Sequence, residues 1–446
     1  MTKNPHKILQ LNINELTAAL AVLLAFTPSV AHSQLSTTTT SVAVAYAPNN
    51  SRELTVSAIA SARQTIELNI YELSSPAIRD ALIDRIRAGV RVRILEEGQP
   101  VSGMSCPGRQ VQADLVTTIE RNPKSKSQFF EMTSKAGGDR RFRFNHAKYT
   151  VIDGISVVVG SENYSPTGQP APGAEGNRGW EVRVYGEKIA SQYQTLFHAD
   201  SDVSFKDVRE LTDSKALMKE LKKTCPKQES GLSEETVRVR SAPAAGRVSP
   251  ILSAQEVIPF TSPENSLQQT LEIVRSATRT LDIQQMSFSD GWDGDEYSSP
   301  MISELLDAAQ RGVRVRVLLN DDRVFVGSGP KKTQNQRTSA YLNRLAGQRR
   351  VTLRSQIANL KKMDVDYIHN KGILADGALT LVSSINWTQN SITNNRETAV
   401  ALYSESIFNY YENIFEADWS VSTLRAAIKS IWEAPGSEIW TFSGDR

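Results

Sequence analysis

The sequence is poor in three features that would each point to a class of protein: net charge, cysteine and long apolar runs. Its 51 Lys and Arg nearly balance its 49 Asp and Glu, giving a formal charge of +2, so no global field directs the chain to nucleic acid or anionic membranes. No run reaches the ~20 apolar residues of a membrane-spanning helix. We therefore expect a mature chain without an integral membrane segment. The 39% of hydrophobic residues are typical of a globular protein with a buried core.

The first 33 residues have the layout of a secretory signal peptide. Lys3 and Lys7 form a basic start, residues 16–26 (LTAALAVLLAF) form an apolar core, and residues 31–33 (AHS) offer a cleavage site. We expect residues 1–33 to be removed and the protein to be secreted or periplasmic. The alternative is an uncleaved N-terminal anchor.

The chain has only two cysteines, Cys106 and Cys225. In an oxidising compartment they can form one disulfide. Their separation in the sequence neither requires nor forbids this bond, so the sequence leaves it open.

One short pattern, His-x-Lys-x4-Asp, occurs twice, and each copy is followed by an apolar run and a polar cluster. The first copy comprises His146, Lys148, Asp153 and the cluster 160–163 (GSEN); the second comprises His369, Lys371, Asp376 and the cluster 383–386 (SSIN). The separations agree, since 369 − 146 = 223, 376 − 153 = 223 and 386 − 163 = 223. A single copy would be a weak signal, whereas two copies in register indicate an internal repeat with a function.

The repeat extends over whole domains. Residues 88–95 (AGVRVRIL) match residues 311–318 (RGVRVRVL), again with 312 − 89 = 223. Alternating apolar strands and helical segments predict parallel strands covered by helices, an α/β sandwich in each half. The predicted boundaries are a first lobe at 42–200, a linker at 201–248, a second lobe at 249–425 and a C-terminal tail at 426–446.

The residue types of the repeat suit phosphate chemistry. Alternate residues of a strand face the same side, so each motif histidine is expected to project beside its lysine. A lysine can neutralise phosphate oxygens while a histidine attacks phosphorus or transfers protons. Neutral donors for the non-bridging oxygens are expected from the polar clusters: Ser161, Asn163, Ser384 and Asn386.

Other chemistries fit less well. Zinc requires three or four closely arranged ligands, which the scattered histidines and cysteines do not offer, and the motif lysines would repel a cation. There is no Gly-x-Ser-x-Gly elbow for a serine nucleophile. His198 has Glu416 at its equivalent position, so we interpret it as structural. The sequence predicts no metal and no cofactor.

With these motifs the chain closely resembles the phospholipase D superfamily over nearly its whole mature length. The resemblance implies two α/β lobes related by a pseudo-twofold axis, with both motifs in one active site at their interface. It also implies metal-independent phosphodiester cleavage through a covalent phosphohistidine. One histidine attacks and the other protonates the leaving group; relatives often use the N-terminal motif as nucleophile, which here is His146, with His369 as acid. The sequence leaves this assignment, and the choice of water or alcohol as acceptor, open.

The resemblance also suggests supporting residues. A downstream glutamate commonly orients the motif histidine in this family, and Glu397 fits that place, with Glu181 as its counterpart in the first half. The motif aspartates, Asp153 and Asp376, are expected to act as structural supports. Ser383 stands where the family usually has glycine, a mild departure.

Two substrates remain open, phospholipid and nucleic acid, for a protein that we expect to be a monomer. Export and the family favour hydrolysis of phospholipid headgroups to phosphatidic acid, with the loop bearing Phe288, Trp292 and Tyr297 as a lipid-contacting element. Basic clusters before each motif favour a secreted non-specific endonuclease: Lys124, Lys126, Arg140, Arg141 and Arg143, then Lys331, Lys332, Arg337, Arg349, Arg350 and Arg354. A non-catalytic phosphate-binding module is a minor alternative, opposed by the presence of both histidines and both lysines.

Overall fold

Two mixed sheets, each covered by helices, form the two lobes of the protein. The computed structural model describes residues 39–226, 248–327, 329 and 331–432. The predicted signal peptide at 1–33 lies outside these residues, as do residues 227–247 of the predicted linker and residues 433–446 of the predicted tail. No helix in the described part of the chain combines the length and apolar character needed to cross a membrane.

The first sheet has nine strands. In spatial order they are β8 (Val208–Glu210), β4 (Gln128–Met132), β3 (Arg91–Glu97), β2 (Thr65–Ile70), β5 (Lys148–Ile152), β6 (Ser156–Gly160), β7 (Gly179–Tyr185), β1 (Thr40–Ala47) and β9 (Ile251–Ala254). The helices of this half are α2 (Ser51–Ser61), α3 (Pro76–Arg87), α4 (Cys106–Arg121), α5 (Glu187–Asp200) and α6 (Ser214–Thr224), with short 3-10 turns η1 (Pro123–Ser125), η2 (Ser134–Ala136) and η3 (Val203–Phe205).

The second sheet has seven strands. Their spatial order is β10 (Glu256–Ser262), β16 (Glu397–Tyr403), β15 (Leu379–Ser383), β14 (Lys371–Ala375), β11 (Thr280–Gln285), β12 (Arg314–Leu319) and β13 (Leu353–Ile357). Its helices are α7 (Ser266–Ser276), α8 (Pro300–Gln310), α9 (Arg323–Val326), α10 (Gln334–Arg349), α11 (Leu360–Met363), α12 (Gln389–Thr393) and α13 (Glu405–Trp432).

The same topology appears in both sheets, which confirms the predicted pair of repeated α/β lobes. In the first sheet β2, β3 and β4 are parallel, whereas β5, β6, β7 and β1 continue from β2 in antiparallel pairs. The second sheet repeats this pattern from β11. The parallel pairing predicted from the sequence therefore holds for only part of each sheet, because short turns at residues 153–155 and 376–378 join β5 to β6 and β14 to β15 as antiparallel pairs.

Local signals read from the sequence set the helix ends. Prolines open α3 and α8 at their first turns, where the missing N–H costs no hydrogen bond. Gly89 and Gly312 follow these helices with φ of +87° and +97°, a conformation that glycine adopts without a steric penalty. Both helices thus begin at a proline and are followed by a glycine that stops them.

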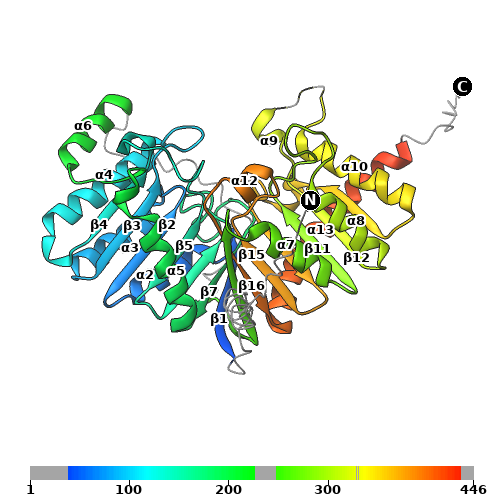
Figure 1. Ribbon diagram of the computed structural model, residues 1–446, viewed down its shortest axis with the longest axis horizontal. Coiled ribbons are helices and arrows are strands. Elements are labelled where there is room, and N and C mark those ends of the chain that lie inside the picture. The colour runs from blue at the N-terminus through cyan, green and yellow to red at the C-terminus, as the bar shows by residue number, and fades with distance from the viewer. Residues whose placement is uncertain (1–38, 227–247, 328, 330, 433–446) are drawn as a thin grey trace, which may run out of the picture. The chain divides into compact units, whose positions relative to one another are not determined.

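Three apolar clusters hold the lobes together. One lies between the first sheet and α2, α3 and α4, and one lies between the second sheet and α7, α8 and α10. The third joins the other faces of both sheets with α5 and α13, where β15 and β16 lie beside strands of the first sheet (Figure 1). The shared cluster packs closely, since a Cβ on Gly372 would lie 2.4 Å from the ring of Trp180.

The segment between the motif lobes is not a simple linker. η3, β8 and α6 lie within residues 201–226; β8 pairs with β4 at the edge of the first sheet, and Cys225 is disulfide-bonded to Cys106 at the start of α4. Strand β9, predicted to belong to the second lobe, pairs with β1 in the first sheet. The closing helix α13 runs to Trp432, beyond the predicted boundary at 425. Turn and strand pairing thus extend the first lobe past its predicted end.

Candidate active site

Each motif histidine lies just before a central strand and is paired with the opposite lobe. His146 donates its backbone N–H to Arg396 O at 2.8 Å, and His369 donates its own to Arg178 O at 2.9 Å. The histidines therefore precede β5 and β14, whereas the sequence analysis placed them inside these strands. Pairing across the lobes brings the two motifs into one site.

The two motif lysines are buried beside the histidines. Lys148 Nζ donates to His146 O at 2.8 Å and lies 5.4 Å from the centre of the Tyr71 ring. Lys371 Nζ donates to His369 O and lies 3.6 Å from Met286 Sδ. Removal from water lowers the pKa of Lys148 to about 8 and that of Lys371 well below its usual range, to which the charge of Lys148 contributes. A bound anion would oppose this lowering and favour the charged form of both lysines.

His146 is held by a carboxylate of the other lobe. Its Nδ1 lies 2.7 Å from Glu397 Oε2. The carboxylate of Glu397 also accepts hydrogen bonds from Ser384 Oγ at 2.6 Å, from Ser391 Oγ and from Asn395 Nδ2 at 3.1 Å. Although burial opposes ionisation, the neighbouring His146 and Lys148 and these hydrogen bonds keep the pKa of Glu397 below its usual value. Glu397 is therefore a fixed anion behind the imidazole.

His369 has a looser carboxylate partner. Its Nδ1 lies 3.2 Å from Glu162 Oε2, within ion-pair distance, but the two are not aligned and Nδ1 has no hydrogen-bond partner among the described residues. Glu162 accepts one hydrogen bond, from Asn177 Nδ2 at 3.0 Å. Burial raises the pKa of Glu162 to about 7. The two histidines are thus supported unequally.

The sequence-based choice of Glu181 as the partner of a motif histidine is wrong. Its carboxylate accepts hydrogen bonds from Thr55 Oγ1 and Gln169 Nε2, and burial raises its pKa to about 8. Strand pairing explains the error. Gly160 pairs with Glu181 and Ser383 pairs with Ala399, so the offset between these strands is 399 − 181 = 218 rather than 223.

With the offset of 218, the position equivalent to Glu397 is Gly179 (397 − 179 = 218). A Cβ on Gly179 would lie 2.1 Å from Glu162 Oε1. The carboxylate of Glu162 therefore occupies, in the first lobe, the space that the side chain of Glu397 occupies in the second lobe. The Pro- and Gly-rich loop at 166–176 contributes to the five extra residues (223 − 218 = 5) that shift the register.

The motif aspartates lie at the far ends of their strands. Asp153 accepts backbone hydrogen bonds from Arg63, Gln64 and Thr65, and Asp376 accepts the equivalent bonds from residues 278–280. At ~3.3 Å per residue, five residues place Asp153 roughly 16 Å along the strand from Lys148. Both aspartates tie the strand ends to the preceding loops, as expected for supports.

The polar clusters meet the motifs in different ways. Ser384 Oγ contacts Glu397, whereas Ser161 Oγ accepts from the backbone N–H of Trp180 at 3.1 Å. Asn163 and Asn386 each bury a side-chain oxygen that has no partner among the described residues. The serines therefore serve as scaffold, and the two asparagines remain candidates for contact with phosphate oxygens.

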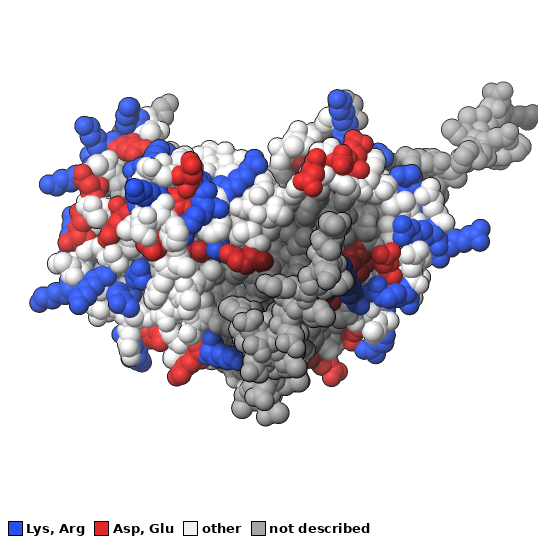
Figure 2. Space-filling view, in the orientation of Figure 1, with Lys and Arg blue, Asp and Glu red and all other residues white. Residues whose placement is uncertain are grey.

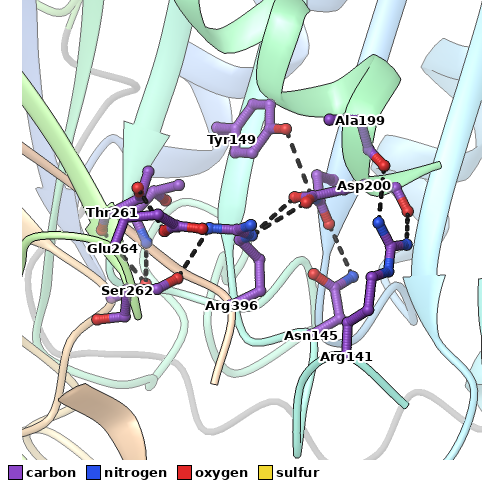
Figure 3. A network of polar contacts seen from close by, with 12 residues as sticks. Arg141, Asn145, Tyr149, Ala199, Asp200, Thr261, Ser262, Glu264 and Arg396 are labelled. Atoms are coloured by element: carbon purple, nitrogen blue, oxygen red, sulfur yellow. Dashed lines mark hydrogen bonds and ion pairs between the residues drawn. The ribbon is translucent and has the colours of Figure 1, made fainter. Parts of the chain in front are cut away.

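Two buried ion pairs join the lobes around the site. Arg396 lies 2.9 Å from Asp200, and Arg178 lies 2.8 Å from Asp418. The pairs are equivalent by the strand offset, since 396 − 178 = 218 and 418 − 200 = 218. Arg396 also donates to Ser262 O at 2.8 Å and to Glu264 at 2.6 Å, and Figure 3 shows it reaching Asp200 at the end of α5. These contacts fix the strand starts from which Glu397 and Gly179 extend.

Several residues of the site were missed by the sequence analysis: Tyr71, Glu162, Arg178, Ser391, Asn395 and Arg396. Tyr71 stacks edge-on against His146 with ring centres 4.9 Å apart. Glu162 lies inside the cluster GSEN, but its equivalent in the repeat is Ile385 (385 − 162 = 223), so the repeat gave no signal. Arg178 and Arg396 do show a signal in the sequence, because they occupy equivalent positions directly before β7 and β16.

One acidic group in the described part of the chain has the spacing to hold a metal ion: Asp282, Glu412 and Glu416. It contains no motif residue, and Arg316 is ion-paired with both Asp282 and Glu416. The positive charge of the motif site comes from its lysines.

Comparison with known proteins matches both lobes to one family. The sequence profile described as cardiolipin synthase, PLD-like domain, matches residues 55–201 and 270–419. A mitochondrial cardiolipin hydrolase of Chlamydomonas reinhardtii is 28% identical over 156 residues, covering 35% of this chain and 58% of the relative. That of Canis lupus familiaris is 27% identical over 157 residues, covering 35% and 51%. The chain thus spans about half the length of the curated relatives it matches.

Among solved structures, the chain is similar to phosphatidylserine synthase of Haemophilus influenzae Rd KW20. The two are 14% identical, with a TM-score of 0.58, and the match covers 85% of this chain and 88% of the other. At this identity the likeness concerns the fold, and it extends over both lobes.

Proposed function

The chain belongs to the phospholipase D superfamily, in the family described as cardiolipin synthase, PLD-like domain; from this premise we propose that it is a phosphodiesterase and that it hydrolyses the headgroup bond of phospholipids. The products are phosphatidic acid and the free headgroup alcohol. The observation that carries the proposal is the pairing of two buried His–Lys motifs across the lobes, with His146 bonded to Glu397. The lysines supply the charge that binds phosphate, so the reaction requires no metal or cofactor.

The unequal support of the histidines suggests their roles. Burial lowers the pKa of His146 to about 4 although the charge of Glu397 raises it, while burial and both lysines lower the pKa of His369 well below its usual range. The Glu397 carboxylate, 2.7 Å from Nδ1 of His146, stabilises a proton on that ring, whereas Nδ1 of His369 has no aligned carboxylate. A bound phosphate anion favours the proton on His146 further by offsetting the lysine charges. We assign His146 as the acid and His369 as the nucleophile, the reverse of the order common in relatives.

The reaction then has two steps. A ring nitrogen of His369 attacks phosphorus, the bond from phosphorus to the headgroup oxygen breaks, and His146 gives that oxygen its proton. Water next attacks phosphorus and passes a proton to His146, and the phosphorus–nitrogen bond breaks. Phosphatidic acid leaves and both histidines return to their starting states.

Exposed apolar residues near the site support a lipid substrate. In α9, Val324, Phe325 and Val326 are 51%, 51% and 71% exposed. Phe325 packs edge-on against Tyr367, whose ring centre is 5.8 Å from that of His369. Apolar groups placed in this way suit contact with acyl chains at a bilayer surface. Of the three aromatic residues predicted to contact lipid, Phe288 and Trp292 are buried, and only Tyr297, which stacks on Tyr341, is 43% exposed.

The basic clusters give weaker support to a nucleic-acid substrate than the sequence suggested. Arg140 is ion-paired with Glu97, Arg141 with Asp207 and Arg337 with Asp290. On the face in Figure 2, Lys and Arg alternate with Asp and Glu on both lobes. Arginines already paired with carboxylates offer less charge to a phosphate backbone.

The disulfide between Cys106 and Cys225 supports the further proposal that the protein acts in an oxidising compartment after export.

The test is one assay in EDTA that offers phosphatidylcholine vesicles and plasmid DNA side by side. It compares wild type, His146→Asn, His369→Asn and a matched control, His198→Asn, whose ring bonds to Glu67 outside the site. Choline release that is lost in both motif variants and kept in the control supports the proposal. DNA nicking that falls steeply with salt, with vesicles intact, would replace it by a nuclease. Choline release that stays at the wild-type rate in either motif variant would overturn the two-histidine mechanism.

A further inference from the structure

A cavity of about 210 Å³ lies beside the active site in the first lobe. Tyr71 forms a wall shared by both, since its ring packs against His146 and lies near Lys148 Nζ. The cavity is lined by Tyr71, Glu72, Glu96, Glu97, Gly108 and residues 100–105. The cavity therefore adjoins His146 through the Tyr71 ring.

Three glutamates, Glu72, Glu96 and Glu97, contribute carboxyl groups to this cavity. Glu97 is ion-paired with Arg140 and accepts the backbone N–H of Asn145 and Gln99, each at 2.7 Å. Within the described residues no Lys or Arg forms an ion pair with Glu72 or Glu96. Burial raises the pKa of Glu96 well above its usual range, so its carboxyl group stays neutral until a bound cation favours its ionisation. Glu72 lies near enough to Lys148 for its charge to raise the pKa of that lysine.

Glu96 is buried with one oxygen unused. Its Oε1 accepts the backbone N–H of Leu73 at 2.9 Å, whereas its Oε2 is buried and has no hydrogen-bond partner in the described part of the chain. The residue is only 2% exposed. A buried, unpaired polar atom in a cavity wall costs free energy that a ligand can recover.

The acidic lining occurs in the first lobe alone. Glu96 and Glu97 correspond to Leu319 and Asn320 in the repeat (319 − 96 = 223, 320 − 97 = 223). Because β2 pairs with β3 as β11 pairs with β12, Tyr71 and Glu72 correspond to Met286 and Ser287 (286 − 71 = 215, 287 − 72 = 215). The substitutions break the pseudo-twofold symmetry on the side of His146.

The size and chemistry of the lining restrict the ligand. The cavity carboxylates are not among the groups whose ligand atoms converge closely enough for a metal ion in the described residues. Pro100, Val101 and Met104 add apolar walls, and an aromatic ring with carboxylates suits an amine or methylated ammonium. The volume fits a small organic group rather than a drug-sized one.

We propose that this cavity is a subsite for the positively charged amine of the leaving headgroup, and that Glu72 and Glu96 select substrates by that charge. The inference rests on the proposed function, because it places the headgroup beside His146, which protonates the leaving oxygen. It predicts preference for headgroups such as choline or ethanolamine over neutral glycerol.

The experiment measures kcat/KM on mixed micelles of phosphatidylcholine and, separately, phosphatidylglycerol, with wild type, Glu96→Gln and Glu72→Gln. Glu131→Gln is the matched control, because Glu131 pairs with Glu96 across β3 and β4 but does not line the cavity. We expect wild type to prefer phosphatidylcholine and either cavity variant to lower the ratio of the two rates at least tenfold. The control should keep the wild-type ratio. Glu72→Gln, at a partly exposed position, serves if Glu96→Gln does not fold.

A second measurement determines the inhibition constant of tetramethylammonium chloride at constant ionic strength. Competitive inhibition that weakens at least fivefold in the cavity variants supports the subsite. Equal wild-type rates on both lipids, or a ratio unchanged in the variants, would overturn it while leaving the hydrolase intact. Failure of the proposed function looks different, since wild type would then cleave neither lipid.

Discussion

His146 Nδ1 lies 2.7 Å from Glu397 Oε2, although the two residues stand 251 positions apart and belong to different lobes. The motif histidine of one half is thus oriented by the other half. The aligned bond fixes the ring and favours its protonated form, as a buried carboxylate does for a neighbouring imidazole.

Replacing Glu397 by glutamine removes that charge while keeping the shape. We expect kcat to fall on the order of 100-fold, within the range that a positioned acid or base contributes, with the alkaline limb of the pH profile displaced to lower pH. Glu181→Gln is the matched control, since Glu181 is also buried near the start of an equivalent strand but bonds elsewhere. Equal losses in the two variants would mean that Glu397 acts only through stability, which urea unfolding would reveal.

The two histidines should respond differently to the leaving group. A p-nitrophenolate leaves without a proton, so His146→Asn should lose much less activity on phosphatidyl-p-nitrophenol than on phosphatidylcholine. His369→Asn should lose activity on both. Rapid denaturation of His146→Asn at alkaline pH during turnover of phosphatidyl-p-nitrophenol should trap the phosphatidyl group on His369, because a phosphorus–nitrogen bond is stable in base and labile in acid. Phosphate found on His146 in the wild type would reverse the assignment.

The buried ion pair between Arg396 and Asp200 should be essential to lobe packing. Arg396→Met leaves a buried carboxylate without a partner, so the free energy of unfolding should drop by about 3–5 kcal/mol. Adding Asp200→Asn should restore part of the loss. The exposed pair of Arg275 and Glu304 gives the comparison, because Arg275→Met should cost about 1 kcal/mol or less. Urea unfolding measures all four proteins.

Lys148 should give activity and stability opposite dependences on alkaline pH. Its pKa is lowered to about 8 by burial, so the free enzyme loses this charge above pH 8 and kcat/KM should fall up to tenfold per pH unit. Between pH 8 and about 10.5 the unfolded chain binds the proton that the folded chain has lost, so this residue adds stability as pH rises. Relative to Lys148→Gln, the wild type should therefore gain free energy of unfolding across this window. A difference that stays flat would contradict the assigned pKa.

The repeat let the sequence locate His146, Lys148, His369 and Lys371, because a constant spacing of 223 survives wherever the chain has no insertion. It failed for the carboxylates. Five extra residues before β7 reduce the spacing between equivalent positions to 218, so the equivalent of Glu397 is Gly179. Glu181 is two residues further along β7, and a shift of two keeps a side chain on the same face of a strand. Glu181 therefore looked like a suitable partner for a motif histidine. Glu162 was invisible because its equivalent is Ile385.

Other differences arose where tertiary pairing overrides local pattern. Residues 208–210 have no strong strand signal, yet β8 forms because the edge of the first sheet offers β4 as a partner. Trp292 and Phe288 resemble a lipid-contacting loop in the sequence but fill the core of the second lobe. The exposure of an apolar side chain depends on tertiary packing, which a short stretch of sequence does not determine.

Each motif histidine is bonded through its backbone to the opposite lobe, so the site forms only when both lobes are folded and packed together. His146 takes its backbone partner from Arg396 and its carboxylate from Glu397, whereas His369 takes them from Arg178 and Glu162. A nascent or partly unfolded chain therefore has neither histidine oriented, and its lysines are solvated and ordinary. The proposed catalysis therefore begins only when the two halves of the chain have docked.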